Sequence, residues 1–141
     1  LRHRVLVVDD NRDSAESLAA FLELSGHDAQ VALDGASAIE LARRMQPDVI
    51  VCDIGLPKMS GHEVARRIRN EAWGGDIVLI ALTGWGQEDD RQRSLDAGFD
   101  HHLVKPVDPV ALARLIGSTP GGAEPRRPTV GAVGSANLRF P

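Results

Sequence analysis

Short apolar runs, each followed by a helical pattern, constrain the fold of this chain more than any other feature of its sequence. Three of the runs are apolar throughout, at residues 5–8, 49–52 and 77–82. Such runs are typical of strands that are buried on both faces of a parallel sheet. Two further runs, at residues 28–32 and 101–104, include polar residues and are therefore expected at the edges of that sheet.

Amphipathic helical patterns separate these runs. Apolar residues recur at the i, i+3, i+4 spacing of a helix face in residues 15–22, 38–45, 61–68 and 109–116. The segment 87–97 has a helical composition but only Leu95 and Ala97 as apolar anchors, so we expect a weakly held helix there. Strands that alternate with helices predict an α/β fold, a (βα)5 doubly wound parallel sheet of the flavodoxin-like type with strand order 2-1-3-4-5.

The composition fits one domain followed by a tail. The chain has 141 residues, of which 43% are hydrophobic and 26% charged, as in an ordinary globular domain. We expect one folded domain over residues 1–117 and a flexible Gly/Pro-rich tail over residues 118–141. Because the first residue is Leu1 and not Met, we expect the chain to be processed or cut from a longer protein.

The charge argues against a nucleic-acid partner. The net charge is −4, and the arginines at positions 66, 67 and 69 are expected to form a solvent-exposed helix face. The longest apolar run is too short to cross a membrane, and no signal-peptide pattern opens the chain. Cys52 lies inside an apolar run and is expected to be a buried thiol in a reducing compartment. We therefore expect a cytoplasmic segment without direct contacts to nucleic acid or membrane.

Polar side chains follow the apolar runs at the points where the strands should end. Asp9 and Asp10 follow the first run, and Asp53 follows the third. In this strand order, the carboxyl ends of the first and third strands border the crevice in which ligands bind. Thr83 follows the fourth run and Lys105 the fifth. We expect these five side chains to converge on one site at this edge of the sheet.

The acidic residues of this site predict a metal ion and phosphoryl chemistry. Three carboxylates in one crevice repel one another, and a small divalent cation with oxygen ligands, Mg²⁺, relieves that repulsion. A carboxylate beside a metal can attack phosphorus, and Asp53, next to the loop that Pro57 and Gly61 create, is the candidate acceptor. Lys105 and Thr83 can stabilise the oxygens of the incoming phosphoryl group. The structural alternative is a buried carboxylate–lysine network, which would be a poor source of stability.

Four motifs in this order resemble the receiver domain of bacterial two-component response regulators. They are Val-Leu-Val-Val-Asp-Asp-Asn at residues 5–11, Asp-Ile-Gly-Leu-Pro at 53–57 with Gly61, Ala-Leu-Thr-Gly at 81–84 and Leu-Val-Lys-Pro at 103–106. The resemblance covers about Arg4 to Gly117. It implies a phosphorelay in which a sensor histidine kinase or a histidine phosphotransfer domain passes a phosphoryl group from a phosphohistidine to Asp53. The surface of the domain would then change to signal onward.

The resemblance also implies a role for each site residue. Asp10, Asp53 and the carbonyl group of Gly55 would ligate Mg²⁺ directly, and Asp9 mainly through water. Thr83 and Lys105 would hold the phosphoryl oxygens. The peptide bond between Lys105 and Pro106 is expected to be cis, a conformation that proline makes accessible.

Two positions depart from the common family pattern. His102 stands three residues before Lys105, where the family usually has the Tyr or Phe of its switch. We weigh a switch role of Thr83 with His102 against an exposed residue of an edge strand. Trp85 stands two residues after Thr83, where it either shields the phosphoryl group from water or lies exposed on the loop.

The leading interpretation is a signalling domain that phosphorylates itself and is not an enzyme, with autophosphatase activity at most. The alternative is a metal-dependent phosphatase with an Asp nucleophile, but such enzymes usually carry a second acid where this chain has Gly55. A third interpretation, an interaction domain that no longer accepts phosphate, conflicts with the presence of all five site residues. Residues 83–90 and 98–108 resemble receivers of hybrid sensor kinases, so we expect either a stand-alone receiver or the cytoplasmic receiver of a membrane-bound hybrid kinase. The oligomeric state is left open.

Overall fold

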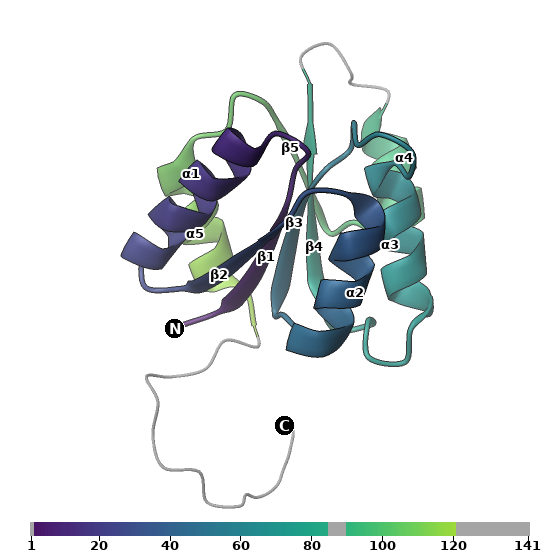
Figure 1. The fold of residues 1–141 in the computed structure, drawn as a ribbon, viewed down its shortest axis with the longest axis horizontal. Coiled ribbons are helices and arrows are strands. Elements are labelled where there is room, and N and C mark those ends of the chain that lie inside the picture. The colour runs from purple at the N-terminus through teal and green to yellow at the C-terminus, as the bar shows by residue number, and fades with distance from the viewer. Residues whose placement is uncertain (1, 85–89, 121–141) are drawn as a thin grey trace, which may run out of the picture.

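The computed structural model describes residues 2–84 and 90–120, which form five strands and five helices in alternation (Figure 1). The strands are β1 (Arg4–Val8), β2 (Asp28–Ala32), β3 (Val49–Asp53), β4 (Val78–Thr83) and β5 (His101–Val104). The helices are α1 (Arg12–Leu24), α2 (Gly35–Met45), α3 (Gly61–Asn70), α4 (Asp90–Ala97) and α5 (Pro109–Ser118). Each element predicted from the apolar patterns is therefore present in this part of the chain.

The five strands form one parallel sheet with the order β2-β1-β3-β4-β5, which confirms the predicted topology. Helices α1 and α5 cover one face of the sheet, and α2, α3 and α4 cover the other (Figure 1). β3 lies in the centre and is buried along its whole length. β2 and β5 lie at the edges and keep partly exposed residues, as their mixed sequences predict.

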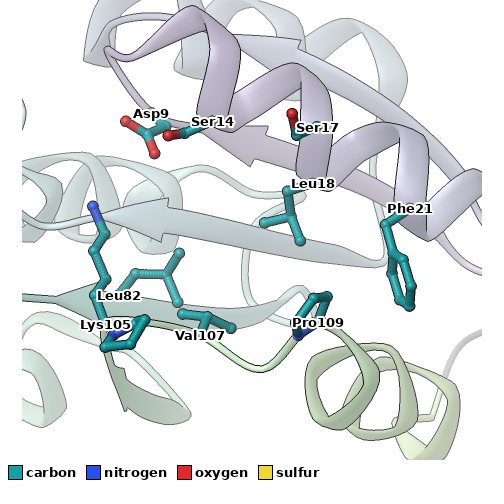
Figure 2. A pocket seen from close by; sticks show the side chains of 10 residues that line it. Asp9, Ser14, Ser17, Leu18, Phe21, Leu82, Lys105, Val107 and Pro109 are labelled. Atoms are coloured by element: carbon teal, nitrogen blue, oxygen red, sulfur yellow. The ribbon is translucent and has the colours of Figure 1, made fainter.

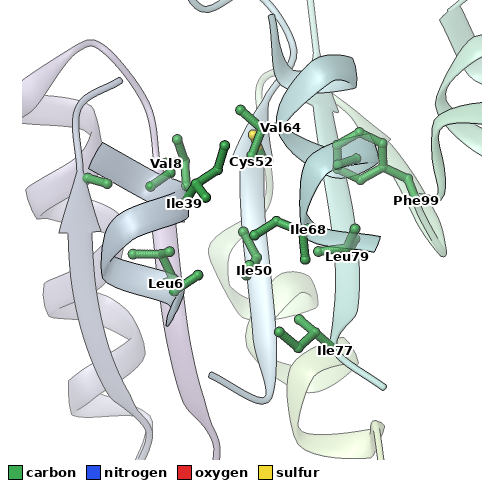
Figure 3. Packing of buried hydrophobic residues seen from close by; sticks show 14 of the residues in the cluster. Leu6, Val8, Ile39, Ile50, Cys52, Val64, Ile68, Ile77, Leu79 and Phe99 are labelled. Carbon is green, nitrogen blue, oxygen red and sulfur yellow. The ribbon is translucent and has the colours of Figure 1, made fainter. Parts of the chain in front are cut away.

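Two apolar layers, one on each face, hold the helices to the sheet. Successive residues of a strand point to opposite faces, so Leu6 joins the layer under α2 and α3, whereas Val5 joins the layer under α1 and α5. Figure 3 shows the first layer, in which Ile50 and Leu79 of the sheet meet Ile68 of α3. Cys52 is buried in the same layer, and burial raises the pKa of its thiol. The predicted buried thiol is thus confirmed.

Side-chain caps fix where four of the helices begin. Each cap residue accepts a hydrogen bond from a backbone N–H of the first turn: Asn11 from Ser14, Asp34 from Ser37, Ser60 from Glu63 and Asp108 from Val110. These N–H groups have no partner within the helix, so the caps stabilise the first turns. Pro109 occupies the first turn of α5, where the missing N–H of proline costs no hydrogen bond.

One prediction about α3 is wrong, because Arg69 does not face solvent. Its side chain is only 22% exposed. The guanidinium donates hydrogen bonds to the backbone carbonyls of Gly74, Ile77 and Gly98 and to the carboxylate of Asp100. The helical pattern places Arg69 on the polar side of α3. The loop after α3 and the turn after α4 pack against that side and cover the arginine. The other two arginines of this helix are exposed as expected and pair with a glutamate of the same helix.

The anchors of α4 also differ from the prediction. Leu95 is 52% exposed, whereas Ala97 is buried as expected. The second buried contact comes from Ser94, which is fully buried and whose hydroxyl oxygen lies 3.3 Å from Nε2 of His62 in α3. Phe99 follows the helix and packs edge-on against the same histidine ring. Small and polar side chains thus hold much of α4, which explains why its apolar pattern is weak.

The C-terminal end of the described domain packs against its N-terminal end. α5 continues to Ser118, one residue past the predicted boundary, and Thr119 is buried. Nε2 of His3 lies 3.0 Å from the carbonyl oxygen of Thr119, and since a carbonyl only accepts, this nitrogen carries the proton. Residues 121–141, most of the predicted tail, lie outside the described residues. Within the described part of the chain, no helix is long and apolar enough to span a bilayer.

Candidate functional site

Three carboxylates meet where β1 and β3 end. Asp9 and Asp10 follow β1, Asp53 is the last residue of β3, and the two strands are neighbours in the sheet. One carboxylate oxygen of each residue lies within 4.8 Å of the other two. Asp9 and Asp53 are each 8% exposed, whereas Asp10 is exposed. The three residues form an acidic cluster with one side open to solvent.

Both oxygens of Asp53 have a hydrogen-bond donor. Oδ1 accepts from the backbone N–H of Gly55 at 3.0 Å, and Oδ2 accepts from the ammonium of Lys105 at 3.0 Å. Lys105 directly follows β5, so its side chain reaches the cluster from the side opposite β1. The peptide bond between Lys105 and Pro106 is cis, as expected. The predicted meeting of the fifth strand with the acidic cluster is therefore present.

Burial raises the pKa of Asp9, and the neighbouring charges of Asp53 and Asp10 act in the same direction. Two donors oppose this effect: the backbone N–H of Asn11, which lies 3.0 Å from Oδ1 of Asp9, and the ammonium of Lys105. The net direction is upward, so a charged Asp9 is costly in this cluster without additional positive charge. A bound cation would supply that charge.

The loop after Asp53 returns to the end of β3 at Gly61. The backbone N–H of Gly61 donates to the carbonyl of Ile54 at 2.9 Å. A Cβ atom at Gly61 would lie 2.6 Å from the carbonyl oxygen of Asp53, so a side chain there would force the loop away from the strand. At Gly55 a Cβ atom would lie 3.8 Å from Oδ1 of Asp53, an ordinary contact distance. A larger residue would thus fit at Gly55, where this chain presents backbone alone.

Thr83 ends β4 and is fully buried. It follows Leu82, the sheet partner of Asp53, and so lies at the same edge as the acidic cluster. Its Oγ1 lies 3.1 Å from Nε2 of His102 and 3.5 Å from the carbonyl oxygen of Leu103. His102 is half-buried, so it is not the exposed edge-strand residue that we weighed against a switch role.

A pocket of about 350 Å³ adjoins the acidic cluster. Figure 2 shows Asp9 and Lys105 at one end of the pocket and Phe21 and Pro109 at the other, with Leu18 between them. The pocket lies between α1 and the segment that joins β5 to α5 (Figure 2). An apolar groove therefore leads directly to two of the site residues.

Sequence reasoning missed this pocket and the backbone donors of the site. An available signal was Phe21, an aromatic residue of α1 that lies outside the apolar stripe of that helix. The N–H groups of Asn11 and Gly55 had no signal, because every residue except proline has such a group and only the loop conformation aims it. Trp85, whose role was left open, lies outside the described residues.

The acidic cluster fits a small divalent cation. Its donors are the carboxylate oxygens of Asp9, Asp10 and Asp53, and oxygen is the ligand atom that Mg²⁺ prefers, whereas zinc sites are usually built from His and Cys. The spacing of 4.8 Å or less lets one ion contact oxygens of all three carboxylates. The opposing ammonium of Lys105 can contact an anionic group that reaches the cluster from solvent.

Comparison with known proteins identifies the family. The sequence model of the response regulator receiver domain matches residues 5–117. The chain is 40% identical over 112 residues to a 14.6 kDa protein in the sodA1 3′ region of Leptolyngbya boryana, covering 79% of this chain and 86% of that one. It is 38% identical over 105 residues to the DNA-binding dual master transcriptional regulator RpaA of a Synechocystis species, covering 74% of this chain and 44% of RpaA. The chain thus spans less than half of that regulator.

A solved structure agrees with the sequence matches. The receiver domain of the sensor histidine kinase PA1611 from Pseudomonas aeruginosa is 31% identical and superimposes with a TM-score of 0.74, over 82% of this chain and 95% of that one. That crystal structure contains a magnesium ion coordinated in its active-site cleft. From the family match over most of the chain and the shared fold, we conclude that this chain belongs to the receiver domains of two-component response regulators.

Proposed function

We propose that Asp53 is the phosphoacceptor of this receiver domain and that it acts with Mg²⁺. The observation that carries the proposal is the position of Asp53 between two carboxylates, those of Asp9 and Asp10, and the ammonium of Lys105. Its carboxylate belongs to the cluster with Asp9 and Asp10, and its Oδ2 lies 3.0 Å from the ammonium of Lys105. A carboxylate held in this way can attack phosphorus while opposite charges contact the phosphoryl oxygens.

The proposed donor is a phosphohistidine on a sensor histidine kinase or a histidine phosphotransfer domain. A carboxylate oxygen of Asp53 forms a bond to phosphorus, the bond between phosphorus and the donor nitrogen breaks, and the electron pair of that bond stays on the imidazole. The Lys105 ammonium turns from Oδ2 of Asp53 to a phosphoryl oxygen, and the Thr83 hydroxyl donates to another. Thr83 and His102, which are in contact, form the proposed switch that couples the site to the surface.

The carboxylates of Asp10 and Asp53 and the carbonyl group of Gly55 are the proposed direct ligands of Mg²⁺. Asp9 is proposed to act mainly through water, as the resemblance to the family implies, and its Oδ1 accepts the N–H of Asn11. When bound, the cation supplies positive charge that offsets the clustered carboxylates and the phosphoryl oxygens. The raised pKa of Asp9 supports a need for such charge.

The pocket beside the site supports a protein donor. The donor imidazole must approach Asp53 from solvent. The surface of the donor protein around this imidazole must therefore cover the receiver surface next to Asp53. Leu18, Phe21 and Val107 offer apolar contact area there, and the pocket continues into Asp9 and Lys105. We infer that a helix that carries the phosphohistidine covers this groove. Nucleic acid is not a proposed partner of this segment, since its net charge is negative.

A stoichiometry experiment separates this function from the phosphatase. The chain is incubated with Mg²⁺ and phosphoramidate, and its intact mass is measured; in parallel, release of phosphate from a phosphomonoester is followed. A receiver gains one phosphoryl group per chain and does not turn over the ester. Continuous hydrolysis of the ester would support the phosphatase instead, for which Gly55 offers no second acid.

A further inference from the structure

Thr83 and Lys105 are the two residues proposed to hold the phosphoryl oxygens. The Thr83 hydroxyl has a single proton, so its contacts in the resting protein decide whether that proton can be donated to a phosphoryl oxygen. It is fully buried, and two neighbours lie within hydrogen-bond distance of its oxygen. Nε2 of His102 lies 3.1 Å away, and the carbonyl oxygen of Leu103 lies 3.5 Å away. A hydroxyl has one proton to donate and two lone pairs with which to accept. The two contacts therefore cannot both use the same proton.

The strand register keeps this contact in place. His102 pairs with Ala81 across β4 and β5, and alternate residues of a strand share a face. Thr83 is two residues after Ala81, so its side chain and that of His102 lie on the same face of the sheet. The backbone N–H of Lys105 donates to the carbonyl of Thr83 at 2.8 Å, which holds the strand end next to the site.

The chemistry of the two neighbours decides the direction of each hydrogen bond. The carbonyl oxygen of Leu103 can only accept, so the contact between it and Thr83 requires the hydroxyl proton. With the hydroxyl proton directed at Leu103, only lone pairs are left for His102, and this arrangement assigns the proton of the 3.1 Å contact to Nε2 of His102. If Thr83 donated to His102 instead, two oxygen atoms without a proton between them would face each other at the Leu103 contact.

From this geometry we propose that His102 is a positioning residue that donates its Nε2–H to Oγ1 of Thr83 and thereby keeps the hydroxyl proton of Thr83 available for the phosphoryl group. This inference rests on the proposed function of Asp53. In the resting protein the hydroxyl proton points to the carbonyl oxygen of Leu103, and this hydrogen bond is weak because its oxygens are 3.5 Å apart. A phosphoryl oxygen is a stronger, charged acceptor, so the proton turns to it while the bond from His102 stays in place.

The opposite proton arrangement would make His102 an obstacle. A bare Nε2 would accept the hydroxyl proton of Thr83, and phosphorylation would first have to break that bond. A phenylalanine at this position could neither donate nor accept, so it would leave the Thr83 oxygen without its donor. A glutamine has an amide N–H₂ at the end of a side chain of similar reach and can donate in place of the imidazole.

The first test is made on the unphosphorylated wild-type chain with ¹⁵N-labelled histidine. Long-range proton–nitrogen NMR correlations report which ring nitrogen of His102 carries the proton. We expect a proton on Nε2. A neutral ring that is protonated on Nδ1 alone would overturn the proposal, and this result depends neither on a variant nor on phosphorylation.

The second test compares His102→Phe and His102→Gln in phosphorylation by phosphoramidate with Mg²⁺, each also in a Thr83→Ala background. Loss of one hydrogen bond predicts a rate about fivefold lower in His102→Phe, with most of the loss rescued in His102→Gln. In the Thr83→Ala background the two variants should be equal, since the partner of the hydrogen bond is gone.

Equal rates of His102→Phe and the wild type, or the same fivefold loss without Thr83, would overturn the positioning role. If the wild-type chain itself takes up no phosphoryl group, the proposed function of Asp53 fails. The NMR result still decides the direction of the hydrogen bond in that case.

Discussion

At the scale of single residues, the Asp53 carboxylate is held from two sides by groups of different kinds. The N–H of Gly55 belongs to the loop that directly follows and is fixed by the backbone, whereas the ammonium of Lys105 arrives on a flexible side chain from β5. Only the second group can follow a new anionic partner. Lys105 can therefore move from a carboxylate oxygen to a phosphoryl oxygen without any movement of the sheet.

The two acids of β1 should differ in their effect on Mg²⁺ binding. Asp9 and Asp10 are adjacent, but Asp9 already accepts the N–H of Asn11 and is nearly buried, whereas Asp10 is exposed beside the cluster. We expect Asp10→Asn to weaken Mg²⁺ affinity by more than tenfold and Asp9→Asn to weaken it less, because a direct ligand loses more than one that acts through water. Titration with Mg²⁺ followed by backbone amide NMR shifts measures both. Equal losses would contradict the assignment of ligands.

The sequence sufficed to predict the residues of the acidic cluster, because carboxyl ends of neighbouring parallel strands share one edge. It was not sufficient for the contact between Thr83 and His102. That contact depends on which rotamers the two side chains adopt and on the register of β4 against β5, neither of which has a periodic signal. The sequence left His102 with two interpretations; the structure excludes an exposed side chain, and the switch role stays a proposal.

At the scale of elements, Arg69 of α3 connects the loop after its own helix to the turn that follows α4. Its guanidinium contacts the loop between α3 and β4 through Gly74 and Ile77, and the turn between α4 and β5 through Gly98 and Asp100. The carboxylate of Asp100 also accepts the backbone N–H of Leu79 in β4. One side chain thus anchors the C-terminal end of α4.

Removal of the Arg69 donors should destabilise the fold. Arg69→Met keeps most of the apolar stem but leaves several partly buried carbonyls without a donor, so we expect the free energy of unfolding to fall by about 3 kcal/mol. The matched control is Arg66→Met on the same helix, because the Arg66 side chain is 53% exposed and pairs with Glu63 of its own helix. Its effect should stay within about 0.5 kcal/mol. Urea denaturation of both variants measures the difference; equal values would show that the Arg69 contacts contribute little.

Helix periodicity located four of the helices and composition located α4, but the environments predicted for Arg69 and Leu95 were wrong. A periodic pattern indicates which side of a helix faces the sheet. Neither Arg69 nor Leu95 lies in the centre of an apolar stripe, so the pattern says little about their surroundings. It does not report which loops return beside the helix. The chain around Gly98 packs next to Arg69, whereas Leu95 is left exposed and Ser94 fills the buried position against α3.

At the scale of the whole molecule, different residues gather at the two ends of the strands. The acidic cluster lies at the carboxyl ends, and a buried pair of histidines lies at the amino ends of β1 and β2. The backbone N–H of His3 donates to Nδ1 of His27 at 3.1 Å, and their rings meet edge-on with centroids 5.4 Å apart. Since His3 also contacts Thr119, the pair joins the beginning of the fold to its end.

The histidine pair should make stability depend on pH. Burial lowers the pKa of His27, and the neighbouring His3 acts in the same direction, against the attraction of Asp28. The unfolded chain ionises at the ordinary value of about 6.5, so below it the unfolded state binds more protons and the free energy of unfolding decreases as pH falls. His27→Asn retains an acceptor for His3 and cannot ionise, so its stability should fall less between about pH 7 and about pH 5. Urea denaturation at both values tests this; an unchanged slope would contradict it.

The strand order was predictable because the sequence of each strand indicates how deeply that strand is buried in the sheet. Runs that are apolar throughout mark β1, β3 and β4 as central, and mixed runs mark β2 and β5 as edges. The histidine pair was not predictable in this way. His3 lies 24 residues from His27 and 116 from Thr119, and no local pattern connects residues at such separations.

Chemical mapping of the phosphoryl group identifies the phosphoacceptor residue itself. The chain is phosphorylated with phosphoramidate and Mg²⁺, treated with sodium borohydride, which reduces an aspartyl phosphate to homoserine, and then digested for peptide mass spectrometry. We expect homoserine at position 53 alone and none in Asp53→Asn. Homoserine at Asp9 or Asp10, or equal phosphorylation of Asp53→Asn, would contradict it.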